Sequence, residues 1–142
     1  MKSIFLGAIA ALTFAFSSSI SAQISLTDLI VKKPVPGQTV GAAYFSLANL
    51  GDSERVLVGV SSGSAESIEM HTHVHHHDMM AMEQMESVDI PANAVLKFEP
   101  GKNHLMVFSP EETAMESGVI ELIFEFQDGE TLSATAAVEG WQ

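Results

Sequence analysis

The sequence predicts an all-β protein, a two-sheet antiparallel β-sandwich of Greek-key type, with a closed barrel as the alternative. Short apolar segments alternate with clusters of Pro, Gly, Asn, Asp and Ser throughout residues 24–138. Several of these segments alternate apolar and polar residues with the period of two that is typical of half-buried strands. No long segment has helical periodicity. Many short strands separated by regular turn signals favour a sandwich.

Nine segments carry the strand pattern. They are Ile24–Val31, Val40–Leu47, Arg55–Val60, Ala65–Met70, Met85–Ile90, Val95–Glu99, His104–Phe108, Val119–Phe126 and Leu132–Val138. The period is clearest near the end of the chain, where Ile120 and Phe126 lie on one predicted face and Glu121 and Glu125 on the other. Asp128-Gly129 then predicts a hairpin turn. Glu111–Gly118 is expected to form one short helical turn.

The first 22 residues have the layout of a secretory signal peptide. A charged start is followed by an apolar run from Ile4 to Phe16 and then by small residues. We expect cleavage after Ala22, with Ser21 as the second choice. The apolar run is short for a membrane anchor, which needs about 20 residues. No cysteine follows it, so a lipid-anchored form is not favoured. Residues 23–142 then form one domain, exported to the periplasm.

Charge and cysteine content exclude several classes of protein. Six Lys and Arg residues stand against 18 Asp and Glu residues, for a net charge of −12 at pH 7. Such a surface repels phosphate backbones and anionic lipid, so we expect neither nucleic-acid binding nor stable membrane association. The chain has no cysteine. Disulfides, a thiolate nucleophile, a blue-copper thiolate ligand and an iron–sulfur cluster are therefore excluded.

Histidine and methionine are concentrated in one part of the chain. All six histidines, and six of the eight methionines, lie between Met70 and Met106. Imidazole and thioether are copper ligands, and the soft thioether favours Cu(I). Calcium or magnesium would call for clustered carboxylates instead. The alternative is a mobile His- and Met-rich loop without a fixed site, with Met70, Met85 and Met115 as core fillers.

An antiparallel meander predicts where the candidate ligands meet. If the chain leaves the sheet at His71, returns near Met82 and starts a later strand at His104, these three residues share one end of the sheet. Met106 follows His104 by two residues, so the two side chains point to the same face, while Leu105 points to the core. The alternatives are a hydrogen-bonded edge histidine for His104 and an ordinary apolar strand residue for Met106.

The spacing of these four residues resembles the signature of the PCuAC periplasmic copper chaperones. Ten residues separate His71 from Met82, 21 separate Met82 from His104, and one separates His104 from Met106. Flanking segments also resemble the family: Pro36-Gly37, Gly41–Tyr44, Asn49–Asp52, Glu69–His73, Val88–Ala92 and Pro100-Gly101. The resemblance implies a cupredoxin-like β-sandwich and a Cu(I) site formed by His71, Met82, His104 and Met106. It also implies copper delivery to cytochrome c oxidase, at the CuA site of subunit II, often beside a thioredoxin-like Sco protein.

The chain departs from the family in the residues that follow His71. Additional histidines, with Met79 and Met80, enrich the segment Thr72–Ala81, which we expect to be a mobile wall of the site. The added histidines are His75, His76 and His77. Together with His73 they could form a second, weaker site for Cu(II), which prefers nitrogen ligands. His73 could also replace His71 in the main site.

The predicted function is binding and hand-over of copper by a monomer, without catalysis. An electron-transfer cupredoxin is excluded by the absence of cysteine. An oxygenase with an N-terminal histidine ligand would need His where Gln23 is expected, and a dismutase would need histidines on several strands, whereas five of the six lie within seven residues. A periplasmic sequestration or resistance protein without a dedicated acceptor is the remaining alternative.

Overall fold

The computed structural model describes residues 23–141, so the predicted signal peptide lies outside the described part of the chain. The all-β prediction is confirmed, since these residues form ten strands and one short helix. No helix among residues 23–141 is long and apolar enough to cross a membrane. The elements are β1 (Ile24–Lys32), β2 (Val40–Asn49), β3 (Arg55–Ser61), β4 (Ala65–His76), β5 (Met79–Met85), β6 (Val88–Ile90), β7 (Val95–Phe98), β8 (His104–Pro110), α1 (Glu112–Ser117), β9 (Val119–Phe126) and β10 (Thr131–Glu139).

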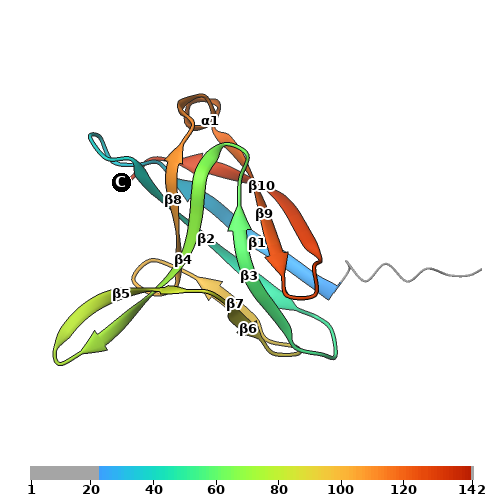
Figure 1. Ribbon diagram of the computed structural model, residues 1–142. Coiled ribbons are helices and arrows are strands. Elements are labelled where there is room, and N and C mark those ends of the chain that lie inside the picture. The colour runs from blue at the N-terminus through green and yellow to red at the C-terminus, as the bar shows by residue number, and fades with distance from the viewer. Residues whose placement is uncertain (1–22, 142) are drawn as a thin grey trace, which may run out of the picture.

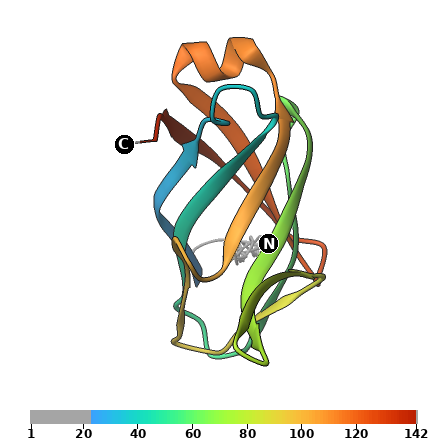
Figure 2. The same ribbon diagram turned by 90° about the vertical axis from the view of Figure 1, so that its left-hand side faces the viewer.

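The strands form one continuous, curled sheet rather than two separate antiparallel sheets. Its order is β5-β4-β8-β2-β1-β10-β9-β3-β6, with β7 paired to β2. All pairs are antiparallel except β1 with β10, which is parallel. The sheet folds back on itself so that β3 lies near β4, as Figures 1 and 2 show. No hydrogen-bonded ladder joins these two strands. The sheet of the described residues is therefore open, with β5 and β6 at its ends.

The core lies inside this curled sheet and fixes the face that each strand turns inward. The ring of Phe45 packs edge-on against Phe98 and Phe124, with centroid separations of 4.4 and 5.0 Å. On β9, residues 120, 122, 124 and 126 are buried and Glu121 and Glu125 are exposed, as the period of two predicts. On β8, Leu105 is fully buried, so its neighbours on the strand turn to the other face.

The predicted mobile segment Thr72–Ala81 is a β-hairpin. Strand β4 does not end at Met70 but continues to His76, and β5 begins at Met79. His77 and Asp78 form a two-residue turn with φ values of 48° and 65°, the left-handed pair that a type I′ hairpin turn requires. The prediction was wrong because a polar segment without alternating apolar residues was read as a loop, although it contains neither Gly nor Pro.

The predicted meander was also wrong in its strand pairing. The segment Met85–Ile90 is split between β5 and the short β6, and β6 pairs with β3 instead of β7. Strand β7 pairs with β2. Strand β8 lies between β4 and β2, so β4 and β8 are direct neighbours. His71 thus lies inside a strand, directly opposite His104.

Candidate metal centre

One face of the three adjacent strands β5, β4 and β8 carries nearly all the candidate ligands. The pairing register sets His71 opposite His104 and Met70 opposite Leu105. Because Met70 and Leu105 are buried in the core, the alternate residues of both strands face outward. At this end of the sheet the outward residues are Glu69, His71, His73 and His75 on β4, Met80, Met82 and Gln84 on β5, and His104 and Met106 on β8.

His71 and His104 form the inner part of this face. Their rings are nearly parallel, with centroids 6.0 Å apart and an angle of 26° between the planes. Only 8% of His104 is exposed. Its Nδ1–H donates to the backbone carbonyl of Lys102 at 2.9 Å. That bond assigns the proton to Nδ1 and leaves the Nε2 lone pair free, which is the arrangement of a metal-ligating histidine.

His71 has the complementary arrangement. Its Nε2–H donates to Oε2 of Glu69 at 2.8 Å, and its Nδ1 is buried with no hydrogen-bond partner. A buried polar atom without a partner costs about 1–3 kcal/mol. A metal ion bound at Nδ1 would remove that cost. The residues present therefore fit a metal ion on this face, with a carboxylate–histidine pair orienting the ring.

His73 belongs to the same cluster. Its ring centroid lies 5.1 Å from that of His104, closer than that of His71. Its Nδ1 also donates to the Lys102 carbonyl, at 3.2 Å. The rings of His71 and His73 therefore both lie near that of His104, and the choice between His71 and His73 as a ligand stays open.

The Lys102 carbonyl is held by the turn that precedes β8. The amide of Lys102 donates to the carbonyl of Glu99 at 3.1 Å, and Gly101 has a φ of +80°. Pro100 followed by Gly101 is the residue pair that a type II turn prefers. The ammonium of Lys102 lies 2.9 Å from the exposed Glu99 carboxylate and lowers the pKa of that group. The turn thus presents one carbonyl to two histidines.

The two methionines occupy different positions on the face. Met106 is partly buried on β8, opposite Glu69. Met82 is 53% exposed on β5, opposite His73. Across the sheet they are two strand spacings apart, about 10 Å. Along the strands they are four residues apart, about 13 Å. The structure therefore brings Met106 close to the inner histidines, and Met82 would reach the same ion only if the β4–β5 hairpin bent toward β8.

The four histidines expected to form a Cu(II) site are not brought together. His73 and His75 share the outward face, whereas His76 points to the other face, where its Nε2 contacts Glu83 at 3.3 Å. His77 lies in the turn. Among residues 23–141, no three His, Asp or Glu side chains are arranged to hold a metal ion by themselves.

Comparison with known proteins identifies the family. Residues 24–138 match the family described as "Putative lipoprotein LpqE-like". The chain belongs to this family. Its curated relatives include a putative lipoprotein of Leifsonia xyli, Lxx21020, which is 27% identical over 72% of this chain and 63% of the relative. The uncharacterized protein RP573 of Rickettsia prowazekii is 29% identical over 61% of this chain and 49% of the relative. The chain thus spans about half to two thirds of the length of these relatives.

Solved PCuAC domains have the same fold as this LpqE-like chain. The copper-bound PCuAC domain from PmoF2 has a TM-score of 0.68 at 19% identity, covering 84% of this chain and 94% of that one. Apo-DR1885 from Deinococcus radiodurans has a TM-score of 0.64 at 23% identity, and the match covers 99% of this chain and 95% of that one. The Cu(I) form of DR1885 has a TM-score of 0.60 at 25% identity, and the match covers 82% of this chain and 76% of that one. The PCuAC resemblance and the cupredoxin-like fold predicted from the sequence are confirmed.

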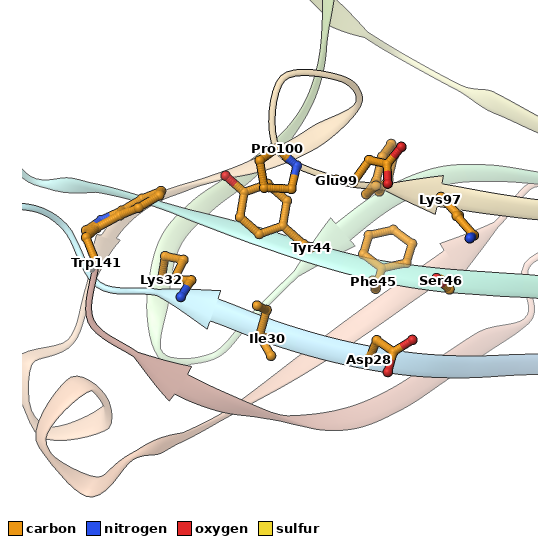
Figure 3. Close-up of a pocket in the computed structure, with 11 residues that line it drawn as sticks. Asp28, Ile30, Lys32, Tyr44, Phe45, Ser46, Lys97, Glu99, Pro100 and Trp141 are labelled. Carbon is orange, nitrogen blue, oxygen red and sulfur yellow. The ribbon is translucent and has the colours of Figure 1, made fainter.

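A cavity of about 350 Å³ lies apart from the His/Met face, over β1, β2 and β7. Figure 3 shows Tyr44 beside Pro100, with Lys32 and Trp141 further along the same opening. Burial raises the pKa of the Tyr44 hydroxyl, against a smaller opposing effect of Lys32. The lining includes no histidine or methionine, so this cavity does not offer the soft ligands found on the β5-β4-β8 face.

Two residues of the site were missed by sequence reasoning. Glu69 lies two residues before His71, which places both on one face of a strand, and this signal could have been used. The carbonyl of Lys102 leaves no such signal, because any residue type offers the same backbone oxygen. Its role depends on the strand register, which brings a turn beside β4.

Proposed function

We propose that this LpqE-like chain is a copper carrier that binds Cu(I) through His71, His104, Met106 and Met82 and passes it to a copper acceptor protein. One observation carries the proposal. The unpartnered, buried Nδ1 of His71 lies on the same face as the free Nε2 of His104, and Met106 follows on that face. Copper-bound relatives of the same fold support the choice of metal.

The ligand types favour Cu(I) and hand-over. Thioether sulfur is a soft ligand that suits Cu(I), and neutral imidazole completes a mixed nitrogen and sulfur site. Met82 is half-exposed, so an acceptor can replace it before the inner ligands are released. Ligand exchange of this kind needs no redox step and no catalytic group, so we assign the protein a binding role rather than an enzymatic one.

We further propose that the protein is exported and works in the periplasm. The predicted signal peptide supports this assignment, and so does the description of its family as putative lipoproteins. The chain contains no cysteine, which favours a soluble exported form.

The proposed acceptor is cytochrome c oxidase subunit II, at its CuA site, or a Sco-like protein that serves it. The competing function is sequestration of excess copper without a dedicated acceptor. Incubating the Cu(I)-loaded protein with an apo subunit II domain, and measuring copper in each after separation, distinguishes the two. Transfer supports a chaperone; retention of copper supports sequestration.

The proposed site is tested by Cu(I) titration of the purified protein against a chromogenic chelator. The parent should bind one Cu(I) with high affinity. Met106→Leu and His104→Asn each remove one donor and should weaken binding by about tenfold or more, since about 1.4 kcal/mol corresponds to tenfold. Met115→Leu is the matched control, because Met115 is buried in the core away from the face. Equal affinities in all four proteins would refute the site.

A further inference from the structure

The outer part of the β4–β5 hairpin carries a regular pattern, of which the main site uses only Met82. Every histidine of β4 beyond His71 stands directly opposite a methionine of β5. The three pairs are His73 with Met82, His75 with Met80, and His76 with Met79. Figure 1 shows this hairpin projecting from the rest of the sheet.

These methionines have no packing role that would explain them. Met79, Met80 and Met82 are 72%, 55% and 53% exposed. Met70 and Met115, in contrast, are buried in the core. A thioether that stays in water contributes no burial energy. Three of them on one short hairpin, each facing an imidazole, indicate ligand chemistry instead.

The distance across the hairpin suits a soft metal ion. Directly opposed residues of an antiparallel pair have Cβ atoms about 4.5–5.5 Å apart. A flexible methionine side chain can therefore bring its sulfur to an ion held by the opposite imidazole. Cu(I) binds stably at low coordination number, and thioether and imidazole are both ligands that it accepts.

We propose that His75 and Met80 form a second Cu(I) site near the tip of the hairpin, from which the ion moves along one face to the main site. This inference rests on the proposed function of the inner site. His75, His73 and His71 follow one another on the same face of β4 at intervals of about 7 Å. The pair His73–Met82 lies between the tip and His104 and is the intermediate step. Each step exchanges one neutral ligand for another, so no electron or proton has to be supplied.

The turn sets the register that this path needs. Because the hairpin loop has only two residues, His77 and Asp78, each histidine is fixed opposite its methionine. A slip of one residue would turn the histidines of β4 and the methionines of β5 to different faces. The pair His76–Met79 has the same residue types on the opposite face, but the Nε2 atom of His76 contacts Glu83 at 3.3 Å and the pair lies off the path, so it provides an internal control.

The test is NMR of the purified protein with ¹³C-methyl-labelled methionine, titrated with Ag(I) as a redox-inert substitute for Cu(I). The first equivalent should shift the methyl signal of Met106, and the second should shift that of Met80. In His75→Asn/Met80→Leu the second equivalent should bind about tenfold more weakly or worse, and loading of the first site should slow several-fold. In the control His76→Asn/Met79→Leu both should match the parent.

The outcomes separate this inference from the proposed function. If Met106 shifts but Met80 does not respond to a second equivalent, the tip site is refuted and the main site stands. If Met106 does not shift at all, the proposed function fails and the path fails with it. If the control variant slows loading as much as His75→Asn/Met80→Leu, transfer along one face is refuted.

Discussion

The hydrogen bond from His71 to Glu69 gives a sharp test of how the inner site is built. Replacing Glu69 with Ala removes the acceptor that holds Nε2–H and frees the ring of His71 to turn its Nδ1 away from the ion. Loss of such an orienting partner costs about 10- to 100-fold in metal affinity. Because the Glu69 side chain is 35% exposed, water can partly replace it. We therefore expect the affinity for Cu(I) to fall by about tenfold, the lower end of that range, which corresponds to about 1.4 kcal/mol.

The assay is competition for Cu(I) with a chromogenic chelator at neutral pH, with Glu83→Ala as the matched control. Glu83 contacts the Nε2 atom of His76 in the same manner, at 3.3 Å, but on the opposite face of the hairpin. Thermal unfolding of the metal-free proteins should show a loss of about 1 kcal/mol or less for both variants, because each loses one part-exposed hydrogen bond. Parent-like affinity in Glu69→Ala, or equal weakening in Glu83→Ala, would refute the assigned role of Glu69.

Three further predictions concern protons, the turn and processing. Cu(I) affinity should fall as the solution is acidified, because protons compete for imidazole nitrogen but not for thioether sulfur; an affinity that does not change on acidification, measured by chelator competition, would argue against histidine ligands. His77→Asn/Asp78→Gly should raise the thermal unfolding midpoint, with a gain of about 1 kcal/mol, since Asn-Gly adopts the left-handed turn with less strain; an unchanged or lower midpoint would contradict a type I′ turn. Mass spectrometry of the exported protein should find Gln23 at the N-terminus, and an intact Met1 would contradict signal-peptide cleavage.

Much of the fold was predictable because the buried strands alternate strictly. Strand β9 is the clearest case, since Ile120, Leu122, Phe124 and Phe126 point inward and the intervening glutamates point to solvent. The helix Glu112–Ser117 lies within the predicted segment Glu111–Gly118 and ends where Gly118 adopts a left-handed conformation, with a φ of 85°.

The strand pairing was not predictable from local pattern. Strand β6 has three residues and β7 has four, and their partners β3 and β2 are distant in the sequence. Nothing in Val88–Ile90 itself indicates that it pairs with Arg55–Leu57. The parallel pairing of β1 with β10 is also set by the way the sheet curls around its core, not by either strand alone.

The candidate ligands were predictable from spacing, but their arrangement was not. The prediction that His71 and His104 meet came from an incorrect meander, and the two residues meet because β8 pairs directly with β4. The length of the β4–β5 hairpin explains why His73 lies beside His104. It also explains why strand β4 lies between Met82 on β5 and Met106 on β8. The length of the hairpin could not be predicted, because its exposed histidines do not alternate with apolar residues in the pattern that indicates a strand.

The central claim is that one Cu(I) is held by imidazole nitrogen and thioether sulfur together. X-ray absorption of the protein loaded with one equivalent of Cu(I) tests it most directly, because nitrogen and sulfur neighbours give separate scattering shells. The claim predicts both shells at one copper per chain, and loss of sulfur scattering in Met82→Leu/Met106→Leu. A copper spectrum with nitrogen or oxygen neighbours alone, or one unchanged in the double variant, would contradict it.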